Sequence, residues 1–203
     1  MLEFITPNPL ESVETLIPSV LPWLHEACGL YYDWLLGSQA LADEHLSRML
    51  RDSQSEFSIG TVEILMFDGQ PAGGFISYSG EELARRCKVH TLQLLKTGRS
   101  QLRRSIMERI SQIRNHGLGV DNCDYYLRVL GVMREFRGRG FGRVMMDRYL
   151  EKGFQLGYRR FRLHVESTNQ AALRLYSSMS FQIQDTIEYP GLGMKLISEV
   201  LLR

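Results

Sequence analysis

Hydrophobic residues recur along this chain with two periods, at every second position in some segments and at every third or fourth position in others. The first period is typical of strands and the second of helices that bury one face. Strands are predicted over residues 2–6, 61–67, 72–79, 124–133, 163–168, 183–189 and 194–201. Helices are predicted over residues 9–28, 38–51, 81–95, 102–113, 144–156 and 171–179. The mixture places the fold in the α/β (α+β) class.

Turn residues join two pairs of these strands into hairpins. Asp68-Gly69 separates the strands at 61–67 and 72–79, and a Pro-Gly turn at 190–193 separates the last two. Gly73-Gly74 lies inside a predicted strand, where it marks a bulge or a close approach of another backbone.

The N-terminal helical segment contains prolines and is followed by aromatic residues. Pro18 and Pro22 must start, kink or split a helix over residues 9–28. The sequence LYYDWLL at 30–36 either packs in the core or lines a pocket, and core packing is favoured. Ser38 can cap the next helix. His45 lies in the apolar stripe of that helix, which favours a packed histidine over a catalytic one.

Residues 80–116 form a long connection between two predicted strands, with helix breaks at Gly98 and at 117–119. One helical stripe in it is apolar, formed by Leu102, Ile106, Ile110 and Ile113. A connection of this length can act as a lid or as a dimer contact. Arginines on its other faces would allow nucleic-acid binding, which the missing aromatic residues between them disfavour.

Length and charge bound the organisation of the chain. Its 203 residues suit one domain spanning 1–203, with 81–116 as a helical insertion. The net charge is +1, but residues 1–80 carry 2 basic and 11 acidic side chains, and residues 81–203 carry 22 and 12. The basic part suits a polyanionic ligand and the acidic part a cationic one. Solvated surface faces explain the same distribution equally well.

The cysteines and the apolar runs indicate a compartment. Cys28, Cys87 and Cys123 are scattered, odd in number and without metal-ligand spacing, so we expect a reducing environment and no metal. The first residues lack the regions of a signal peptide, and no apolar run reaches the roughly 18 residues that a membrane span needs. We therefore expect a cytoplasmic protein that does not cross a membrane.

The most informative stretch is residues 125–143, YYLRVLGVMREFRGRGFGR. Its first half is a predicted buried strand, and its second half is a basic, glycine-rich turn before a helix. Glycines let a backbone approach a ligand, while consecutive N–H groups and the helix dipole favour an anion. Arg137, Arg139 and Arg143 add charge that can pair with phosphate oxygens. The pattern indicates a phosphate-binding turn.

Two motifs in this half of the chain resemble those of one family. The R-x-x-G-x-G pattern at 137–142 resembles motif A of the GNAT superfamily, the acyl-CoA-dependent N-acetyltransferases. The strand at 163–168 with Asn169, the A-x-x-L-Y pattern at 172–176 and Phe181 resemble motif B. The two motifs stand in the family's order and cover residues 125–181. The N-terminal half resembles the family only in its pattern of elements.

The resemblance implies a GNAT fold, with a mixed central sheet of six to seven strands flanked by helices and an extra helical insertion at 81–116. It also implies that the turn binds the CoA pyrophosphate and that the preceding strand splays from its neighbour to pair with pantetheine. The positions that match these roles are Leu130, Gly131, Val132, Arg137, Gly138, Arg139, Gly140, Phe141, Gly142, Arg143 and Asn169. Many members have proline where Arg134 stands, and Gly131 also differs from commoner choices.

Acyl transfer needs a donor at the developing oxyanion and a proton for the leaving thiolate. The resemblance places a backbone N–H near Val132 in the first role and Tyr176, as general acid, in the second. Tyr176 also belongs to an apolar helical stripe, so its ring can pack while its hydroxyl faces the sulfur. The general base stays unassigned among three residues on the two strands nearest the thioester, Glu166, His164 and Tyr126.

The resemblance therefore implies an N-acetyltransferase that moves an acetyl group from acetyl-CoA to a primary amine of a small molecule or peptide by direct attack. The alternative is a CoA-binding sensor or regulatory module without efficient catalysis. Nucleic-acid binding through the basic insertion is a third, disfavoured function. In the family the terminal hairpin borders the acceptor pocket or a dimer interface, which makes a homodimer a further expectation.

Overall fold

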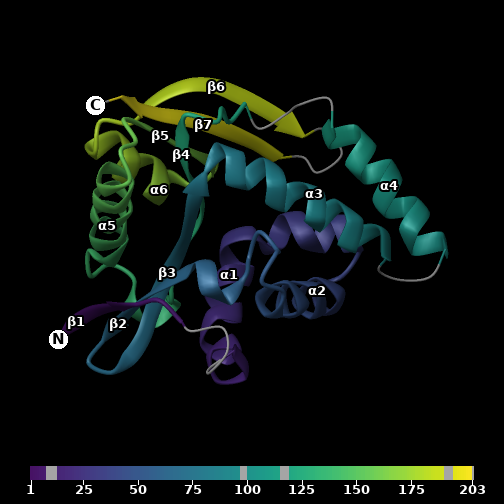
Figure 1. Cartoon of the computed structure of the whole chain (residues 1–203), viewed down its shortest axis with the longest axis horizontal. Coiled ribbons are helices and arrows are strands. Elements are labelled where there is room, and N and C mark those ends of the chain that lie inside the picture. The colour runs from purple at the N-terminus through teal and green to yellow at the C-terminus, as the bar shows by residue number, and fades with distance from the viewer. Residues whose placement is uncertain (8–12, 97–99, 115–118, 190–193, 203) are drawn as a thin grey trace.

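The structure, a computed structural model, describes residues 1–7, 13–96, 100–114, 119–189 and 194–202. Seven strands form one sheet in the order β1-β2-β3-β4-β5-β7-β6 (Figure 1). They are β1 (Leu2–Ile5), β2 (Val62–Phe67), β3 (Gln70–Ser79), β4 (Asp124–Val132), β5 (Arg160–Glu166), β6 (Gln182–Tyr189) and β7 (Met194–Leu202). Among the described strands β4 and β5 pair in parallel and all other neighbours pair antiparallel. The predicted mixed sheet is confirmed.

Helices cover both faces of this sheet (Figure 1). One face carries α5 (Phe141–Gln155) and α6 (Gln170–Ser178). The other carries α1 (Val13–Leu36), α2 (Gln39–Arg51), α3 (Gly80–Lys96) and α4 (Ser100–Arg114). Short 3-10 helices, η1 (Ile59–Thr61) and η2 (Arg134–Phe136), lie before β2 and before α5.

Each face of the sheet has its own hydrophobic core because side chains along a strand point alternately to opposite faces. On β4, Tyr125 and Leu127 belong to the core under α5, which we call the α5-side core. Tyr126 and Val129 belong to the core under α1, which we call the α1-side core. The central strand therefore connects the two cores.

The first helix is longer than predicted. The prediction ended it at residue 28, but α1 runs unbroken to Leu36, while residues 9–12 lie outside the described part. Pro18 and Pro22 are four residues apart and both exposed, so the carbonyls that lose their amide donors face water. Gly29 lies inside α1, and the His25 ring occupies the space that a Cβ at this position would need.

The aromatic residues at the end of α1 pack in the core, as favoured from the sequence. Tyr32 is completely buried, and Tyr31 and Trp34 are partly buried against the same α1-side core. Ser38 caps α2 by accepting a hydrogen bond from the Leu41 amide at 3.3 Å. His45 is 1% exposed, which confirms a packed histidine.

The first predicted hairpin is present, and its glycines have both predicted effects. Asp68 and Gly69 take positive φ angles of 48° and 77° in the turn, and the β2–β3 register shifts between residues 65 and 66. Gly74 pairs with Gly131 across β3 and β4. A Cβ on either glycine would lie 2.8 Å from the Trp23 ring, so this glycine pair lets the indole pack directly on the sheet.

The helical insertion between the third and fourth strands is confirmed as α3 and α4. Ile106 of α4 is completely buried, and Arg109 of α4 donates through Nη1 to the carbonyls of Trp34 and Leu35 at the end of α1. The insertion is therefore attached to the first helix. Gly98 and residues 115–118 lie outside the described residues. Within the described part, no helix has the length and apolar character needed to cross a membrane.

Candidate functional site

The strands β4 and β5 pair over only part of their length. Their register runs from Asp124–Arg160 to Leu127–Leu163, and the described residues show no pair between them after that. β4 then continues along β3, and β5 continues along β7. We call this divergence the fork, formed by residues 128–132 of β4 and 164–166 of β5.

Leu130, Gly131 and Val132 lie in the fork, where the sequence placed the splayed strand. On one side their backbones pair with residues 73–75 of β3. On the other side, none of the described β5 residues pairs with them. A ligand with amide groups can pair with this edge in place of a strand. The carbonyl of Val132 accepts a hydrogen bond from Nε of Arg137 at 3.1 Å.

The glycine turn connects the end of β4 to α5. Gly138 and Gly140 have φ angles of 76° and 81°, and a Cβ on either would meet nothing within 4 Å. The α5 helix begins at Phe141, earlier than the predicted residue 144, and the Gly140 carbonyl accepts from the amides of residues 143 and 144. The N–H groups of Phe141 and Gly142 come before the first amides that donate within the helix, so they lie at the positive end of the helix dipole.

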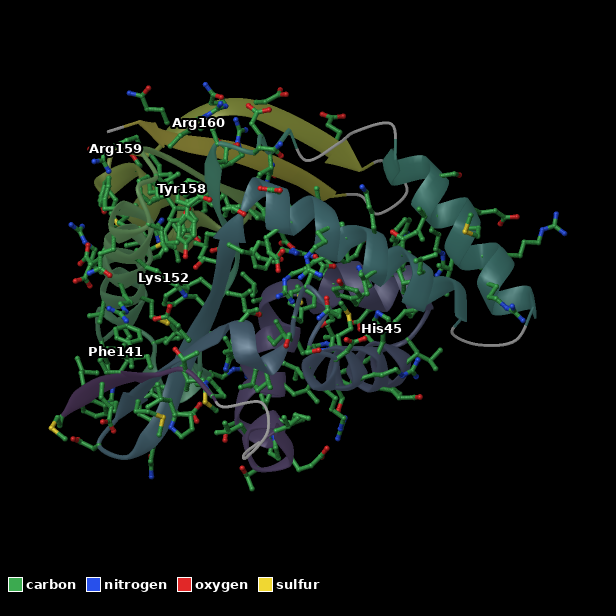
Figure 2. All side chains as sticks on the ribbon, viewed as in Figure 1. His45, Phe141, Lys152, Tyr158, Arg159 and Arg160 are labelled. Atoms are coloured by element: carbon green, nitrogen blue, oxygen red, sulfur yellow. The ribbon has the colours of Figure 1, made fainter. Side chains whose placement is uncertain are left out.

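Two residues of the turn also pack in the core. Phe141 is 6% exposed, lies at one end of α5 (Figure 2), and packs against Phe67 with the ring centroids 5.3 Å apart and the rings tilted by 48°. A Cβ on Gly142 would lie 3.2 Å from the Leu175 side chain of α6. Gly142 therefore permits close packing of α5 and α6, in addition to the binding role predicted for it.

The three arginines of the turn have partners within the chain. Arg137 pairs with Glu26 of α1, which also binds Arg134 at 3.3 Å. The Arg139 guanidinium lies over the rings of residues 67 and 136. Arg143 binds Asp147 at 3.3 Å. All three border the turn, and their contacts with phosphate stay predictions.

The helix α6 places the two predicted residues of the second motif. Asn169 caps it by accepting a hydrogen bond from the Ala172 amide at 3.1 Å. Tyr176 is 7% exposed, belongs to the α5-side core, and lies 6.0 Å from the Phe181 ring. Packing of the Tyr176 ring is thus observed, and its role as general acid stays a prediction.

The opposite face of the fork carries a tyrosine–histidine pair. Tyr126 of β4 and His164 of β5 are hydrogen-bonded, with 3.0 Å between Oη and Nδ1. Glu166, the third residue considered as a base, is half-buried two positions further along β5. The structure therefore joins two of the three candidates into one unit and leaves the third beside them.

A buried ionic cluster borders the same face. Glu56 is 2% exposed and accepts hydrogen bonds from Nε of Arg128 and from Nδ1 of His90, both at 2.6 Å. Burial alone would raise the pKa of the Glu56 carboxyl, but the charges and hydrogen bonds of Arg128 and His90 outweigh it and hold that pKa far below its usual value. Arg128 is the first β4 residue inside the fork.

His45 completes this cluster. Its Nε2 lies 3.1 Å from Nε2 of His90, and it lies between α2 and α3 (Figure 2). Burial, together with the neighbouring His90 and Arg48, lowers the pKa of His45 from 6.5 to about 3. His45 is therefore neutral at physiological pH.

The family model described as the acetyltransferase (GNAT) family matches residues 22–181. This range is more than half of the chain. The chain belongs to the GNAT acetyltransferase family. The match includes both motifs and extends into the N-terminal half, where the sequence showed only a resembling pattern of elements.

Relatives with known names are also acetyltransferases. An acetyltransferase of Yersinia enterocolitica is 36% identical over 73 residues, which are 36% of this chain and 48% of the relative. The chain spans about half the length of the curated relatives it matches.

Solved structures share the fold of this GNAT protein. An N-acetyltransferase from Staphylococcus aureus Mu50 has a TM-score of 0.69 at 16% identity, covering 98% of this chain and 100% of its own. A Drosophila melanogaster polyamine N-acetyltransferase that catalyses the formation of N-acetylagmatine has a TM-score of 0.59 at 16% identity, covering 100% of both chains. At these identities the likeness shows the fold alone.

Two of the thiols in this GNAT protein are poor nucleophiles. Burial raises the pKa of Cys28 and of Cys87 to about 12. Because the thiolate is the attacking form, these cysteines are inert at neutral pH. Neither is suited to carry an acyl group.

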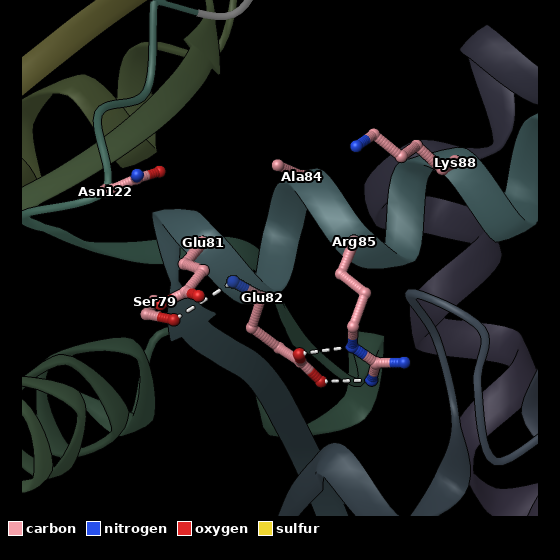
Figure 3. Close-up of a pocket in the computed structure, with 7 residues that line it drawn as sticks. All are labelled: Ser79, Glu81, Glu82, Ala84, Arg85, Lys88 and Asn122. Atoms are coloured by element: carbon pink, nitrogen blue, oxygen red, sulfur yellow. Dashed lines mark hydrogen bonds and ion pairs between the residues drawn. The ribbon is translucent and has the colours of Figure 1, made fainter.

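A groove of about 450 Å³ lies away from the fork, at the start of α3 (Figure 3). It is lined by Ser79, Glu81, Glu82, Ala84, Arg85, Lys88 and Asn122. Within it the Glu82 carboxylate binds Arg85 at 2.6 Å. Ser79 pairs with Tyr125 near the start of β4, whereas the glycine turn follows the end of β4. We therefore give the groove no part in acyl transfer.

Sequence reasoning missed the ionic cluster. Glu56 lies in a polar loop, and its partners come from α3 and β4, which no local pattern connects to it. The available signal was Arg128, the one charged residue in the sequence between Tyr125 and Met133. A buried arginine requires a buried partner, but its sequence position does not identify that partner.

Proposed function

We propose that this GNAT protein is an N-acetyltransferase that moves the acetyl group of acetyl-CoA to a primary amine. The observation that carries the proposal is the continuity of the fork with the glycine turn. β4 leaves β5 after Leu127 and continues into the turn that starts α5. An extended amide ligand on the open edge of β4 would therefore bring an attached phosphate group to a helix N-terminus.

The residues of the turn fit the pyrophosphate of CoA. Gly138 and Gly140 leave open space where side chains would otherwise stand, so the backbone N–H groups of 138–142 can reach phosphate oxygens. Arg137, Arg139 and Arg143 border this space and can exchange their present partners for phosphate. The backbone of 130–132 would hold the pantetheine amides.

Acetyl-CoA supplies the thioester, and residues of the chain assist its exchange with the amine. The Val132 N–H would stabilise the charge that develops on the carbonyl oxygen. Tyr176 would give its hydroxyl proton to the departing sulfur. Cys28 and Cys87 are poor nucleophiles, and Cys123 stands before the start of β4, at the other end of the strand from the glycine turn, so direct attack by the amine is favoured over an acyl-cysteine route.

We propose a small cationic amine as the acceptor. The acidic N-terminal part, with 11 acidic and 2 basic residues among the first 80, would attract such a substrate. The Drosophila neighbour forms N-acetylagmatine, so agmatine is a suitable first probe. A peptide amine is the second acceptor class to test.

The test is CoA thiol release from acetyl-CoA with agmatine, spermidine and a peptide that begins with alanine. We expect amine-dependent release by the wild type and a fall of about 100-fold in kcat in Tyr176→Phe, the size typical of a lost acid–base group. CoA binding, measured by calorimetry, should be retained because the phenyl ring keeps the packing.

Tyr158→Phe is the matched control, since its ring stacks on Tyr125 beyond the far end of α5 (Figure 2). It should leave turnover unchanged. CoA binding without release from any amine would instead support a sensor. Absence of CoA binding would remove the assignment of the glycine turn.

A further inference from the structure

Tyr126 and His164 meet where the two parallel strands separate. The last β4–β5 pair joins Leu127 to Leu163, so Tyr126 lies one residue before the fork and His164 is its first residue on β5. Their hydrogen bond is 3.0 Å long, and their rings are in edge contact with centroids 5.6 Å apart. Tyr126 is 2% exposed and His164 is half-buried, so the pair lies within the α1 side of the sheet, next to the residues that form the fork.

Ion pairs flank the two residues on both sides. Towards the start of the strands, Asp124 is completely buried and binds Arg162 at 2.8 Å and Arg160 at 2.9 Å. Towards the fork, the buried Glu56 carboxylate pairs with the partly buried Arg128, as described above. The carboxylates of Asp124 and Glu56 therefore have cationic partners within the chain, and Glu166 lies half-buried two residues beyond His164.

The tyrosine–histidine pair is not needed to hold the strands in register. Four consecutive residue pairs and the Asp124 salt bridges already join β4 to β5. The pair adds to the fork a hydroxyl and an imidazole that share one hydrogen bond, and imidazole is the side-chain group that most often accepts protons in proteins. We therefore assign the pair to proton transfer and not to the stabilisation of the β4–β5 pairing.

We propose that Tyr126 and His164 together remove the proton that the attacking ammonium must lose. This role rests on the proposed function, because only an amine acceptor requires it. Tyr126 Oη takes the proton, directly or through one water molecule, while its own hydroxyl proton moves to Nδ1 of His164. His164 must then be neutral before the step, with its hydrogen on Nε2, and becomes a cation.

The other proton transfers complete the reaction without a net gain or loss of protons by the chain. The amine nitrogen forms its bond to the carbonyl carbon, the carbon–sulfur bond breaks, and the sulfur takes the hydroxyl proton of Tyr176. The second proton lost by the nitrogen restores Tyr176, and His164 releases its proton to solvent. The products are the amide, the free thiol of CoA and one proton.

The test compares Tyr126→Phe, His164→Asn and the double variant, using the fastest amine among agmatine, spermidine and the alanine peptide. Asparagine can keep a hydrogen bond to Tyr126 but cannot take a proton. We expect each single variant to lose about 100-fold in kcat. The double variant should be no slower than the slower single one, because the two residues act as one unit.

Tyr125→Phe is the matched control. Tyr125 lies on the same strand as Tyr126, and its buried hydroxyl is 3.0 Å from Ser77 Oγ, but its ring belongs to the α5-side core. The variant therefore removes a hydroxyl of the same kind from the other face of the sheet. It should keep wild-type kcat. All variants should bind CoA within about twofold of the wild type, which separates a lost proton acceptor from a damaged fold.

The pH profile of kcat/KM is a second readout. The kcat/KM of the wild type should fall at acid pH, because a protonated imidazole cannot accept the proton from Tyr126, whereas the kcat/KM of His164→Asn should follow the ionisation of the amine alone. The other charged or titratable side chains next to the pair are those of Asp124, Arg128, Arg162, Glu166 and Tyr78. Glu166→Gln should keep the fall of activity at acid pH but move it to lower pH, because a neighbouring carboxylate favours the charged form of an imidazole.

The outcomes separate this role from the proposed function. A wild type that acetylates no amine contradicts the proposed function and with it this role. A wild type that is active, together with a His164→Asn variant that keeps more than half of its kcat and the wild-type pH profile, overturns the role of the pair alone.

Discussion

The burial of His45 makes the stability of this GNAT protein depend on pH. The pKa of His45 is lowered to about 3, so His45 stays neutral in the folded chain, whereas the unfolded chain binds a proton below pH 6.5. The free energy of unfolding should therefore fall as the pH drops from 6.5, by up to about 1.4 kcal/mol per pH unit. Urea titrations at pH 7.5, 6.0 and 5.0 measure this fall.

The variant His45→Gln isolates the contribution. It should be less stable than the wild type at pH 7.5, because it loses packing in the α1-side core, but its free energy of unfolding should change less between pH 6.5 and 5. This range lies above the usual pKa of Glu56, 4.5, so the carboxyl does not contribute to the difference. Equal slopes in both proteins would show that His45 is not the group responsible.

Buried polar partners are also the part of the site that the sequence does not reveal. The glycine turn, Asn169 and Tyr176 were identified because their spacing is local and resembles a family. Glu56 and the pairing of Tyr126 with His164 depend on residues far apart in the chain, on strand register and on loop position. Such contacts appear only when the elements are placed in space.

At the scale of elements, the glycine turn makes a separate prediction. Gly138 and Gly140 have positive φ angles, so alanine at either position should lower the free energy of unfolding by about 1 to 2 kcal/mol. A Cβ at Gly140 would also stand in the open space where we place phosphate. Gly140→Ala should therefore weaken CoA binding by about tenfold or more, a loss of about 1.4 kcal/mol, measured by calorimetry.

Gly157 provides a matched control at the other end of the same helix. Its φ is 88°, and a Cβ there would also meet nothing within 4 Å. Gly157→Ala should lower stability by a similar amount while CoA binding stays at the wild-type level. If Gly140→Ala binds CoA as tightly as Gly157→Ala does, the turn does not hold the pyrophosphate.

The predicted helices differ from the observed ones in their continuity and in their end residues. Pro18 and Pro22 were expected to start, kink or split the first helix, and α1 is continuous through both, since they lie on the exposed face where water can bind the freed carbonyls. The turn after β4 was placed correctly, but α5 starts at Phe141, three residues before the predicted start. Periodicity identifies which face of a helix is apolar and leaves its ends less certain.

At the scale of the whole molecule, one sheet separates two cores of similar make-up. The α1-side core contains Trp23 and Tyr32, and the α5-side core contains Tyr149 and Phe161. Neighbouring residues of one strand belong to different cores. On β3, for example, Phe75 belongs to the α5-side core and Ile76 to the α1-side core. Loss of either core removes the packing from one face of the strands that form the fork.

We therefore predict that the chain unfolds as a single unit, as expected for one domain. Leu46→Ala in the α1-side core and Met145→Ala in the α5-side core should each lower the free energy of unfolding by about 2 to 5 kcal/mol. Both described tryptophans, Trp23 and Trp34, lie on α1, so fluorescence reports the α1 side alone, whereas far-UV circular dichroism reports the whole chain.

In urea titrations the two signals should show the same midpoint in the wild type and in both variants. The Met145→Ala variant is the sharper test, because its substitution and the tryptophans lie on opposite faces of the sheet. If its circular dichroism changes at lower urea than its fluorescence, the two cores unfold separately. The sheet would then connect two units that have independent stability, and the fork would lie at their boundary.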